Sequence, residues 1–387
     1  MKSRISLNSP IFKLLMIFLT WRIILIVILL FSIGLIPLGN KDRFLGGGSI
    51  NYGMAPQLFS WANFDGEHYL SIAIFGYKNL EQAFFPVYPM LISFFSRPDS
   101  TNMLLSLINT SIVGLLISNI SFFFALLFLW KLIKIDFSER IAYLTIILLL
   151  VFPTSFYFGA VYNESLFLLI SVLSFYFARK GNWFLAGLFG MIASATRIFG
   201  ILLLPALLIE ALQQRTNLSK FVWIILIPLG LVVYMFYQFF TVGDFIAFYH
   251  LQKIVGEQHQ SGFTLLPQVY YRYIKMIFTV DIQNPIFQTI VLEFIVGISF
   301  FLLPIYGYYK KIRPSYLIYA LLGFLTPTIQ GSLSSVPRYV IVFFPSFLAA
   351  AFFISKLPKF IQILLLILLF LGLVAETALF LRGYWVA

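Results

Sequence analysis

Acidic and basic side chains gather in one short stretch of an otherwise apolar sequence, WANFDGEHYLSIAIFGY at positions 61–77. Asp65, Glu67 and His68 all lie within it. A carboxylate can accept the proton of an attacking hydroxyl group, and an imidazole can exchange a proton near neutral pH. The stretch is therefore the first candidate for acid–base chemistry.

The same stretch also has a purely structural interpretation. Asp65 precedes a short apolar run that Gly76 can end, so it is suited to cap the N-terminus of a helix in the membrane interface. Glu67 would then interact favourably with the helix dipole, and His68 would be an exposed interfacial residue. Both interpretations stay open, because a capping carboxylate beside the membrane also lies where a lipid-linked head group would arrive.

Further polar residues interrupt apolar segments later in the chain. Asn163 and Glu164, in VYNESLFLLI, lie at the expected outer end of a span, where a glutamate can be solvated or functional. Arg197, in SATRIFGILLLP, is surrounded by apolar residues, and an ionisable residue at membrane depth usually faces a partner or a cavity. Arg338, in GSLSSVPRYVIVFFP, can be an interfacial anchor or a ligand.

Several well-known catalytic patterns are absent from the sequence. It contains no GxxxxGK[ST], GxSxG or HExxH motif, which disfavours a nucleotide phosphate loop, a serine esterase and a zinc protease. Asp65, Glu67 and His68 lack the spacing of a known metal-binding set. We therefore expect no metal site.

The composition indicates an integral membrane protein. Of 387 residues, 61% are hydrophobic and 10% are charged, and the mean hydropathy is +0.96. The net charge of +12 comes mainly from short basic clusters between apolar runs, which we interpret as topology signals and not as nucleic-acid contacts. The chain has no cysteine, so disulfides and thiolate chemistry are excluded.

A helix needs roughly 20 apolar residues to cross about 30 Å of hydrocarbon. The sequence predicts an all-α polytopic fold of about eleven transmembrane helices, of which two are short and meet at Arg197. The expected spans are 12–37, 103–130, 141–158, 163–178, 183–196, 198–212, 220–240, 287–307, 314–330, 337–354 and 358–381. The first span is expected to be retained, because its apolar run exceeds that of a signal peptide and no small-residue cleavage site follows.

Basic clusters set the expected orientation. With eleven spans they all fall on one side, which the positive-inside rule assigns to the cytoplasm. The clusters are Lys2, Arg4 and Lys13; Lys131, Lys134 and Arg140; Arg179 and Lys180; Arg215 and Lys220; Lys310, Lys311 and Arg313; and Lys356 and Lys359. The N-terminus is then cytoplasmic, and the long connections at about 39–102 and 241–286 are non-cytoplasmic, as are the polar site residues. We expect one membrane domain, 1–387, located in the cell membrane if the source is prokaryotic.

Two successive motifs carry a family resemblance. FDGEHYLSIAIFGY followed by EQAFFPVYP resembles the PIG-V family of mannosyltransferases, in which a WDGxHF-type segment precedes GY and AFFPLYP. The likeness continues in the same order through YNESLF, ATRIFG, GDFIAFYH and PRYVIVFFPSF. Phe64 departs from the pattern, since the family usually has tryptophan before Asp-Gly, and the chain is shorter than eukaryotic members.

The resemblance implies a GT-C glycosyltransferase fold with amphipathic helices in the first non-cytoplasmic loop. It implies transfer of one sugar, mannose in this family, from a polyprenyl-phosphate donor to a lipid- or glycan-linked hydroxyl with inversion. Asp65 matches the first-loop aspartate of the superfamily and is the expected catalytic base. Residues expected to bind substrate are Glu67, His68, Tyr88, Asn163, Glu164, Arg197 and Arg338. The two arginines can hold the donor phosphate bidentately, and no cofactor is expected.

Two other functions would use similar residues. A transporter or flippase for a lipid or lipid-linked sugar would also need a buried Glu164 and Arg197, but such folds tend to have paired broken helices in two halves. The sequence shows one short pair of apolar segments and no second copy. A transferase that moves phosphate or a whole oligosaccharide should carry a metal cluster, which the sequence does not show.

Overall fold

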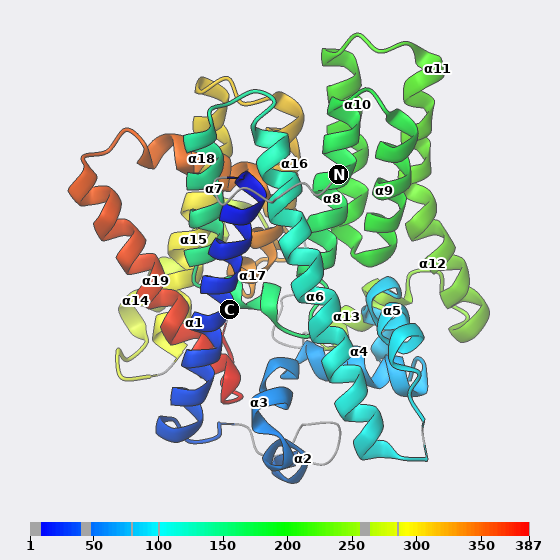
Figure 1. Ribbon diagram of the computed structural model, residues 1–387, viewed down its shortest axis with the longest axis vertical. Helices are drawn as coiled ribbons and strands as arrows, with labels where there is room; N and C mark the ends of the chain where they lie inside the picture. Colours follow the sequence, from blue (N-terminus) through cyan, green and yellow to red (C-terminus); the bar gives the residue numbers. More distant parts are fainter. Residues whose placement is uncertain are drawn as a thin grey trace.

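Figure 1 shows the computed structural model of the chain, which describes residues 9–39, 48–78, 80–99, 101–255, 264–284 and 286–386. Within these ranges the chain forms helices and no strand, which confirms the all-α fold class. Of the charged residues used to predict the topology, Lys2 and Arg4 lie outside the described residues.

Several helices are long and apolar enough to cross a membrane. Among the described residues there are five, namely Pro10–Leu35 (α1), Met103–Ile133 (α6), Ser219–Val242, Ile286–Tyr309 (α15) and Lys359–Leu381 (α19). The third combines α11 (Leu218–Phe221), η5 (Val222–Ile225) and α12 (Leu226–Val242). A sixth candidate, Val336–Val342 with Phe344–Ile354, is bent by 89°. Pro345 contributes to this bend, because it lacks the N–H that a continuous helix would need. These helices support an integral membrane protein.

The other predicted spans coincide with shorter helices. They are α7 (Glu139–Val151), α8 (Glu164–Arg179), α9 (Trp183–Thr196), η4 with α10 (Ile198–Leu202 and Leu203–Gln213), α16 (Pro314–Thr328), and α17, η6 and α18 (Val336–Tyr339, Val340–Val342 and Phe344–Ile354). The predicted span 141–158 is divided, because Pro153 holds Phe152 in an extended conformation and a separate helix, η3 (Ser155–Gly159), follows. Each predicted span therefore has a helical counterpart, while the count of eleven membrane crossings stays a prediction.

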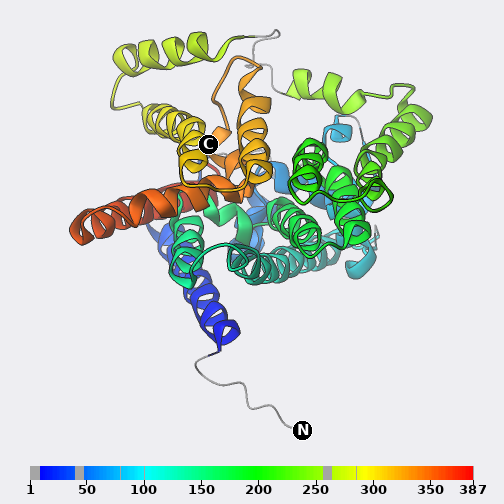
Figure 2. The same ribbon diagram turned by 90° about the horizontal axis from the view of Figure 1, so that it is seen from above.

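The two long connections also fold into helices. The first contains α2 (Gly48–Met54), α3 (Pro56–Phe59), η1 (Ser60–Ala62), α4 (Asp65–Phe75), η2 (Glu81–Ala83) and α5 (Val87–Ser96), and the second contains α13 (Ala247–Val255) and α14 (Leu266–Thr279). Viewed from above, α13 and α14 lie lengthwise along one edge of the bundle (Figure 2). This orientation suits helices at a membrane surface.

The helix predicted after Asp65 is present, but its N-terminus differs from the prediction. Gly76 ends α4 with a φ of 75°, which glycine adopts without steric cost. Asp65 is the first residue of α4 and not its N-cap, and Phe64, the residue before it, has a φ of 60°. No side chain caps this end, so the Asp65 carboxylate is available for a tertiary contact.

Four of the connections predicted to be cytoplasmic lie at one end of the bundle (Figure 1). At this end Glu210 of α10 is fully buried and accepts hydrogen bonds from Arg313 Nε at 2.9 Å and Ser315 Oγ at 2.5 Å. Arg179 Nε lies 3.3 Å from the same carboxylate, and Arg179 also pairs with Asp136. These ion pairs link the connections α6–α7, α8–α9, α10–α11 and α15–α16 at one end of the bundle. This agrees with the expectation that the four connections share one side of the membrane. Helices α2 to α5 lie in the opposite half.

Helix α8 occupies the centre of the bundle. Its first five residues, which cover a full turn, are all buried. Helix α9 packs against both α8 and α12. Glycine allows α9 and α12 to approach closely. A Cβ at Gly187 would lie only 2.0 Å from the Trp223 carbonyl oxygen, and a Cβ at Gly230 would lie 2.0 Å from the Met191 carbonyl oxygen. This packing holds Glu164, the first residue of α8, inside the protein.

Candidate active site

Two carboxylates and two arginines form one continuous chain of ion pairs. Arg338 Nη1 lies 2.5 Å from Asp65 Oδ2, and Arg338 Nε donates to Glu164 Oε1 at 2.7 Å. Arg197 Nη1 lies 2.8 Å from the same Glu164 oxygen. The structure thus brings four residues that the sequence analysis selected separately into direct contact.

Helix ends place these side chains. Asp65 and Glu164 are the first residues of α4 and α8, where the positive end of the helix dipole favours a carboxylate. Arg197 lies in the break between α9 and η4, with an extended backbone at φ −153° and ψ 150°. Arg338 lies in the four-residue α17, just before the 89° bend. The breaks in these helices are what allow four side chains from separate elements to converge.

Exposure differs among the four residues. The side chain of Glu164 is 0% exposed, and those of Arg197 and Arg338 are 8% and 9% exposed. Buried ions are tolerated when they are paired, and here two negative charges balance two positive ones. Asp65 is 33% exposed, so it is the member of the chain that an arriving molecule can reach most easily.

The arginines keep N–H groups that these ion pairs do not use. A guanidinium has five N–H donors. Within the described part of the chain, Arg338 uses Nε and Nη1, and Arg197 uses only Nη1, which also donates to Asn163 Oδ1 at 3.1 Å. Arg338 Nη2 and both remaining nitrogens of Arg197 are left for another acceptor. The cluster can therefore bind an anion without breaking its own ion pairs.

Aromatic rings surround the Arg338 guanidinium. Its Cζ lies 5.1 Å from the ring centre of Tyr157 and 4.6 Å from that of Tyr162. Tyr162 also donates a hydrogen bond from its hydroxyl to the Asn63 carbonyl at 2.6 Å, which joins the segment before Glu164 to the segment before Asp65. The rings shield the cation from water and restrict its orientation.

Comparison with known proteins assigns the chain to a family. The model described as mannosyltransferase (PIG-V) matches residues 11–375 and so includes all four residues of the ion-pair chain. The chain belongs to the PIG-V mannosyltransferase family. It is accordingly a membrane glycosyltransferase. No curated protein matches it.

Two other residues selected for the PIG-V site make internal contacts. Asn163 accepts from Arg197 and donates from Nδ2 to the Thr196 carbonyl at 3.0 Å, so it holds Arg197 in place. Tyr88 is fully buried, and its hydroxyl lies 3.0 Å from the Gly114 carbonyl oxygen and 2.8 Å from Ser118 Oγ. These contacts join α5 to α6, and a direct contact of Tyr88 with substrate stays a prediction.

His68 and Glu67 lie on α4 close to Asp65. The His68 ring stacks on Phe84 with the ring centres 4.7 Å apart, and Nδ1 lies 3.9 Å from Glu81 Oε1. Burial lowers the pKa of His68, but the interaction with Glu81 and the negative charges of the nearby carboxylates outweigh it and raise the pKa above its ordinary value. His68 can thus carry a positive charge beside the site, while Glu67 is half-buried.

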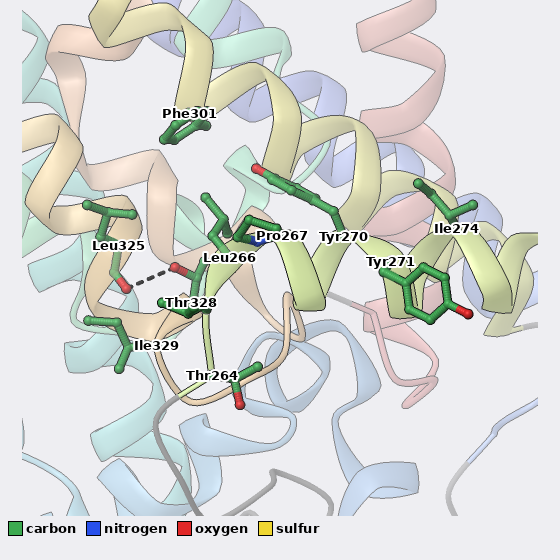
Figure 3. Close-up of a pocket in the computed structure, with 11 residues that line it drawn as sticks. Thr264, Leu266, Pro267, Tyr270, Tyr271, Ile274, Phe301, Leu325, Thr328 and Ile329 are labelled. Carbon is green, nitrogen blue, oxygen red and sulfur yellow. Dashed lines mark hydrogen bonds between the residues drawn. The ribbon is translucent and has the colours of Figure 1, made fainter.

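An apolar groove of about 810 Å³ lies between α14, α15 and α16 (Figure 3). Its lining residues include Leu266, Tyr270, Ile274, Phe301, Leu325 and Ile329. Glu293 of α15 links α14, one wall of the groove, to the segment just before α17. Glu293 accepts from the Tyr273 hydroxyl of α14 at 2.6 Å and from the backbone N–H of Ser335, which is close to Arg338 in sequence, at 3.0 Å. The PIG-V protein therefore has a hydrocarbon-lined groove, one wall of which is hydrogen-bonded through Glu293 to the backbone three residues before Arg338.

Sequence analysis missed some residues that border the site. Tyr157 and Tyr162 carry no signal that separates them from other aromatic residues in an apolar chain. Arg22 does carry one, because it interrupts the first predicted span in TWRIILIVILL just as Arg197 interrupts a later one. Within the described ranges, no group of three or more His, Asp or Glu residues is arranged to hold a metal ion.

Proposed function

We propose that this PIG-V family protein transfers a single mannose from a polyprenyl-phosphate donor to the hydroxyl group of a lipid- or glycan-linked acceptor on the non-cytoplasmic side. The observation that carries the proposal is the chain Asp65–Arg338–Glu164–Arg197, with its most accessible carboxylate at one end. The family match supports mannose as the sugar. A GT-C fold with eleven spans in one domain, 1–387, is part of the same proposal.

Asp65 acts as the general base in this proposal. The acceptor oxygen attacks the anomeric carbon of the sugar, and its proton passes to the Asp65 carboxylate. The bond from the anomeric carbon to the phosphate oxygen breaks at the same time, and polyprenyl phosphate leaves with the electron pair. A single in-line displacement of this kind inverts the anomeric centre.

Arg338 and Arg197 bind the leaving phosphate. A phosphate leaving group needs compensation of its developing charge, and guanidinium groups supply this with paired N–H donors. Glu164 contacts both arginines, so it holds them in position before the donor arrives. Because Arg338 also contacts Asp65, the base and the phosphate-binding groups are joined by one side chain.

The remaining parts of the donor and acceptor have candidate positions. The apolar groove between α14, α15 and α16 suits the polyprenyl chain, since its lining is almost entirely hydrocarbon and membrane lipid can reach it from the side. Glu67 and His68 lie on the same helix as Asp65, which supports the proposal that they contact hydroxyl groups of the sugar or acceptor.

The test is sugar transfer by the purified protein in lipid vesicles, supplied with radiolabelled polyprenyl-phosphate mannose and a native lipid extract as acceptor source. We expect label to appear in a new lipid or glycan product without any added nucleotide sugar. A donor that crosses the bilayer but yields no product would instead support a flippase. A product that gains phosphate together with the sugar would support the other class of transferase.

The proposed orientation can be tested by labelling, because the chain has no cysteine of its own. Met54→Cys in α2 and Lys356→Cys between α18 and α19 both introduce a thiol at an exposed position. In intact cells a membrane-impermeant thiol reagent should label only the first, and the second should react after permeabilisation. If only Lys356→Cys is labelled in intact cells, the orientation of the protein is the reverse of the proposed one.

A further inference from the structure

A third arginine inside the bundle has no part in the proposed reaction. Arg22 lies near the middle of the 26-residue α1, a candidate membrane span. Among the described residues it forms no ion pair with a carboxylate. Because an arginine at membrane depth is costly, it is retained when it does something that an apolar residue cannot.

Arg22 contacts both of the segments that lead to Asp65 and Glu164. Its Cζ lies 4.4 Å from the ring centre of Trp61, which belongs to η1 and precedes Asp65 by four residues. Its Nη1 donates to the carbonyl oxygen of Gly159, which precedes Glu164, at 3.0 Å. The two segments also bond to each other, because Val161 N–H donates to the Trp61 carbonyl at 2.9 Å.

The space around the guanidinium is closely fitted. A Cβ at Gly159 would lie 2.5 Å from Arg22 Nη1 and 3.2 Å from the Trp21 ring, so the glycine leaves room for the charge. Trp61 is 2% exposed, and its position depends on what covers its ring. Gly66, next to Asp65, also packs against the segment before Glu164. A Cβ at Gly66 would lie 3.3 Å from the Val161 carbonyl oxygen.

We propose that Arg22 is a positioning residue for the transfer reaction. By holding Trp61 and Gly159 against α1, it sets the separation between Asp65 and Glu164, and hence the geometry of the Arg338 bridge between them. The proposal rests on the proposed function only in taking these carboxylates as parts of the reaction site. Arg197 belongs to the break between α9 and η4, with which Arg22 makes no contact among the described residues, so the donor-phosphate contact there is less dependent on Arg22.

Arg22→Gln should therefore change the rate of the chemical step more than donor binding. A misplacement of about 1 Å can cost on the order of 10²-fold in rate, so we expect kcat to fall about 10- to 100-fold with little change in the KM for donor. Arg22→Lys, which keeps the charge without the planar fork, should restore part of the loss. Gly159→Ala should lower kcat in the same way, and its effect should not add to that of Arg22→Gln.

The matched control is Glu210→Gln, which breaks buried ion pairs at the opposite end of the bundle. It should lower the melting temperature while leaving kcat per folded molecule unchanged. If Arg22→Gln behaves like this control, or if it and Gly159→Ala act additively, the positioning role is wrong. Failure of the wild-type protein to transfer sugar would count against the proposed function alone.

A second measurement needs no activity. Hydrogen exchange followed by mass spectrometry should show faster exchange in segments 60–66 and 155–163 of Arg22→Gln than in the wild type. The segment around Glu210 should be unchanged in that variant. Unaltered exchange in both site segments would overturn the inference whatever the protein transfers.

Discussion

Asp65→Asn is expected to lower the rate of sugar transfer about 10²- to 10⁴-fold, the range typical of a lost general base. Asparagine has nearly the same size, and its amide oxygen can still accept from Arg338 Nη1, so α4 should stay in place. The amide cannot take the acceptor proton. The measurement is the initial rate of the purified variant with polyprenyl-phosphate mannose, with its melting temperature recorded alongside.

Glu67→Gln is the matched control for this variant, because it neutralises a second carboxylate on the same helix. We expect it to alter substrate affinity without the large loss of rate. Near-normal transfer by Asp65→Asn would remove Asp65 from the reaction and leave Glu67 or Glu164 as the candidate base. The exposed fraction of Asp65, 33%, makes a large loss of stability unexpected, because water screens the broken ion pair.

Arg338→Lys is expected to lower kcat/KM for the donor on the order of 10²- to 10³-fold, as found when a group that stabilises transition-state charge is removed. Lysine keeps the positive charge, but a single ammonium group cannot reproduce the fork that contacts Asp65 and Glu164 together. The measurement is the rate as a function of donor concentration for the purified variant.

Arg197→Lys separates phosphate binding from positioning of the base. Arg197 contacts Glu164 and Asn163 but not Asp65. Its replacement should therefore raise the KM for the donor with a smaller effect on kcat. Unchanged donor dependence in both lysine variants would refute the assignment of the arginines to the phosphate.

Loss of stability is the main alternative explanation for any defect in these variants. Glu164 and Glu210 offer a direct comparison, since each is fully buried and contacts two arginines, one near the proposed site and one at the opposite end. Removing the charge of Glu164 leaves the buried Arg197 without a carboxylate partner among the described residues, at a cost of about 3–5 kcal/mol, and removing that of Glu210 does the same to the partly exposed Arg313. Only the change at Glu164 should also alter donor dependence.

The sequence by itself determined the class of protein and most of its helices. Long apolar runs can satisfy their backbone groups in lipid only as helices, so α1, α6, α15 and α19 follow from composition alone. Gly76 and the break at Arg197 were also predictable, because glycine and an isolated charge mark such positions locally. The same logic selected Asp65, Glu164, Arg197 and Arg338 as charges that interrupt apolar segments, although a helix cap, a solvated span end and an interfacial anchor stayed open for Asp65, Glu164 and Arg338.

The tertiary structure decided how these charges are used. Sequence analysis left Asp65 open between a helix cap and a catalytic base, and it allowed Arg197 either a partner or a cavity. The structure pairs both arginines with Glu164 and pairs Asp65 with Arg338. Ion-pair partners far apart in the chain cannot be inferred from local pattern, because their distances depend on the packing of α8 against its neighbours. Arg22 shows the same point: its charge is visible in the sequence, but its position between Trp61 and Gly159 exists only in the folded bundle.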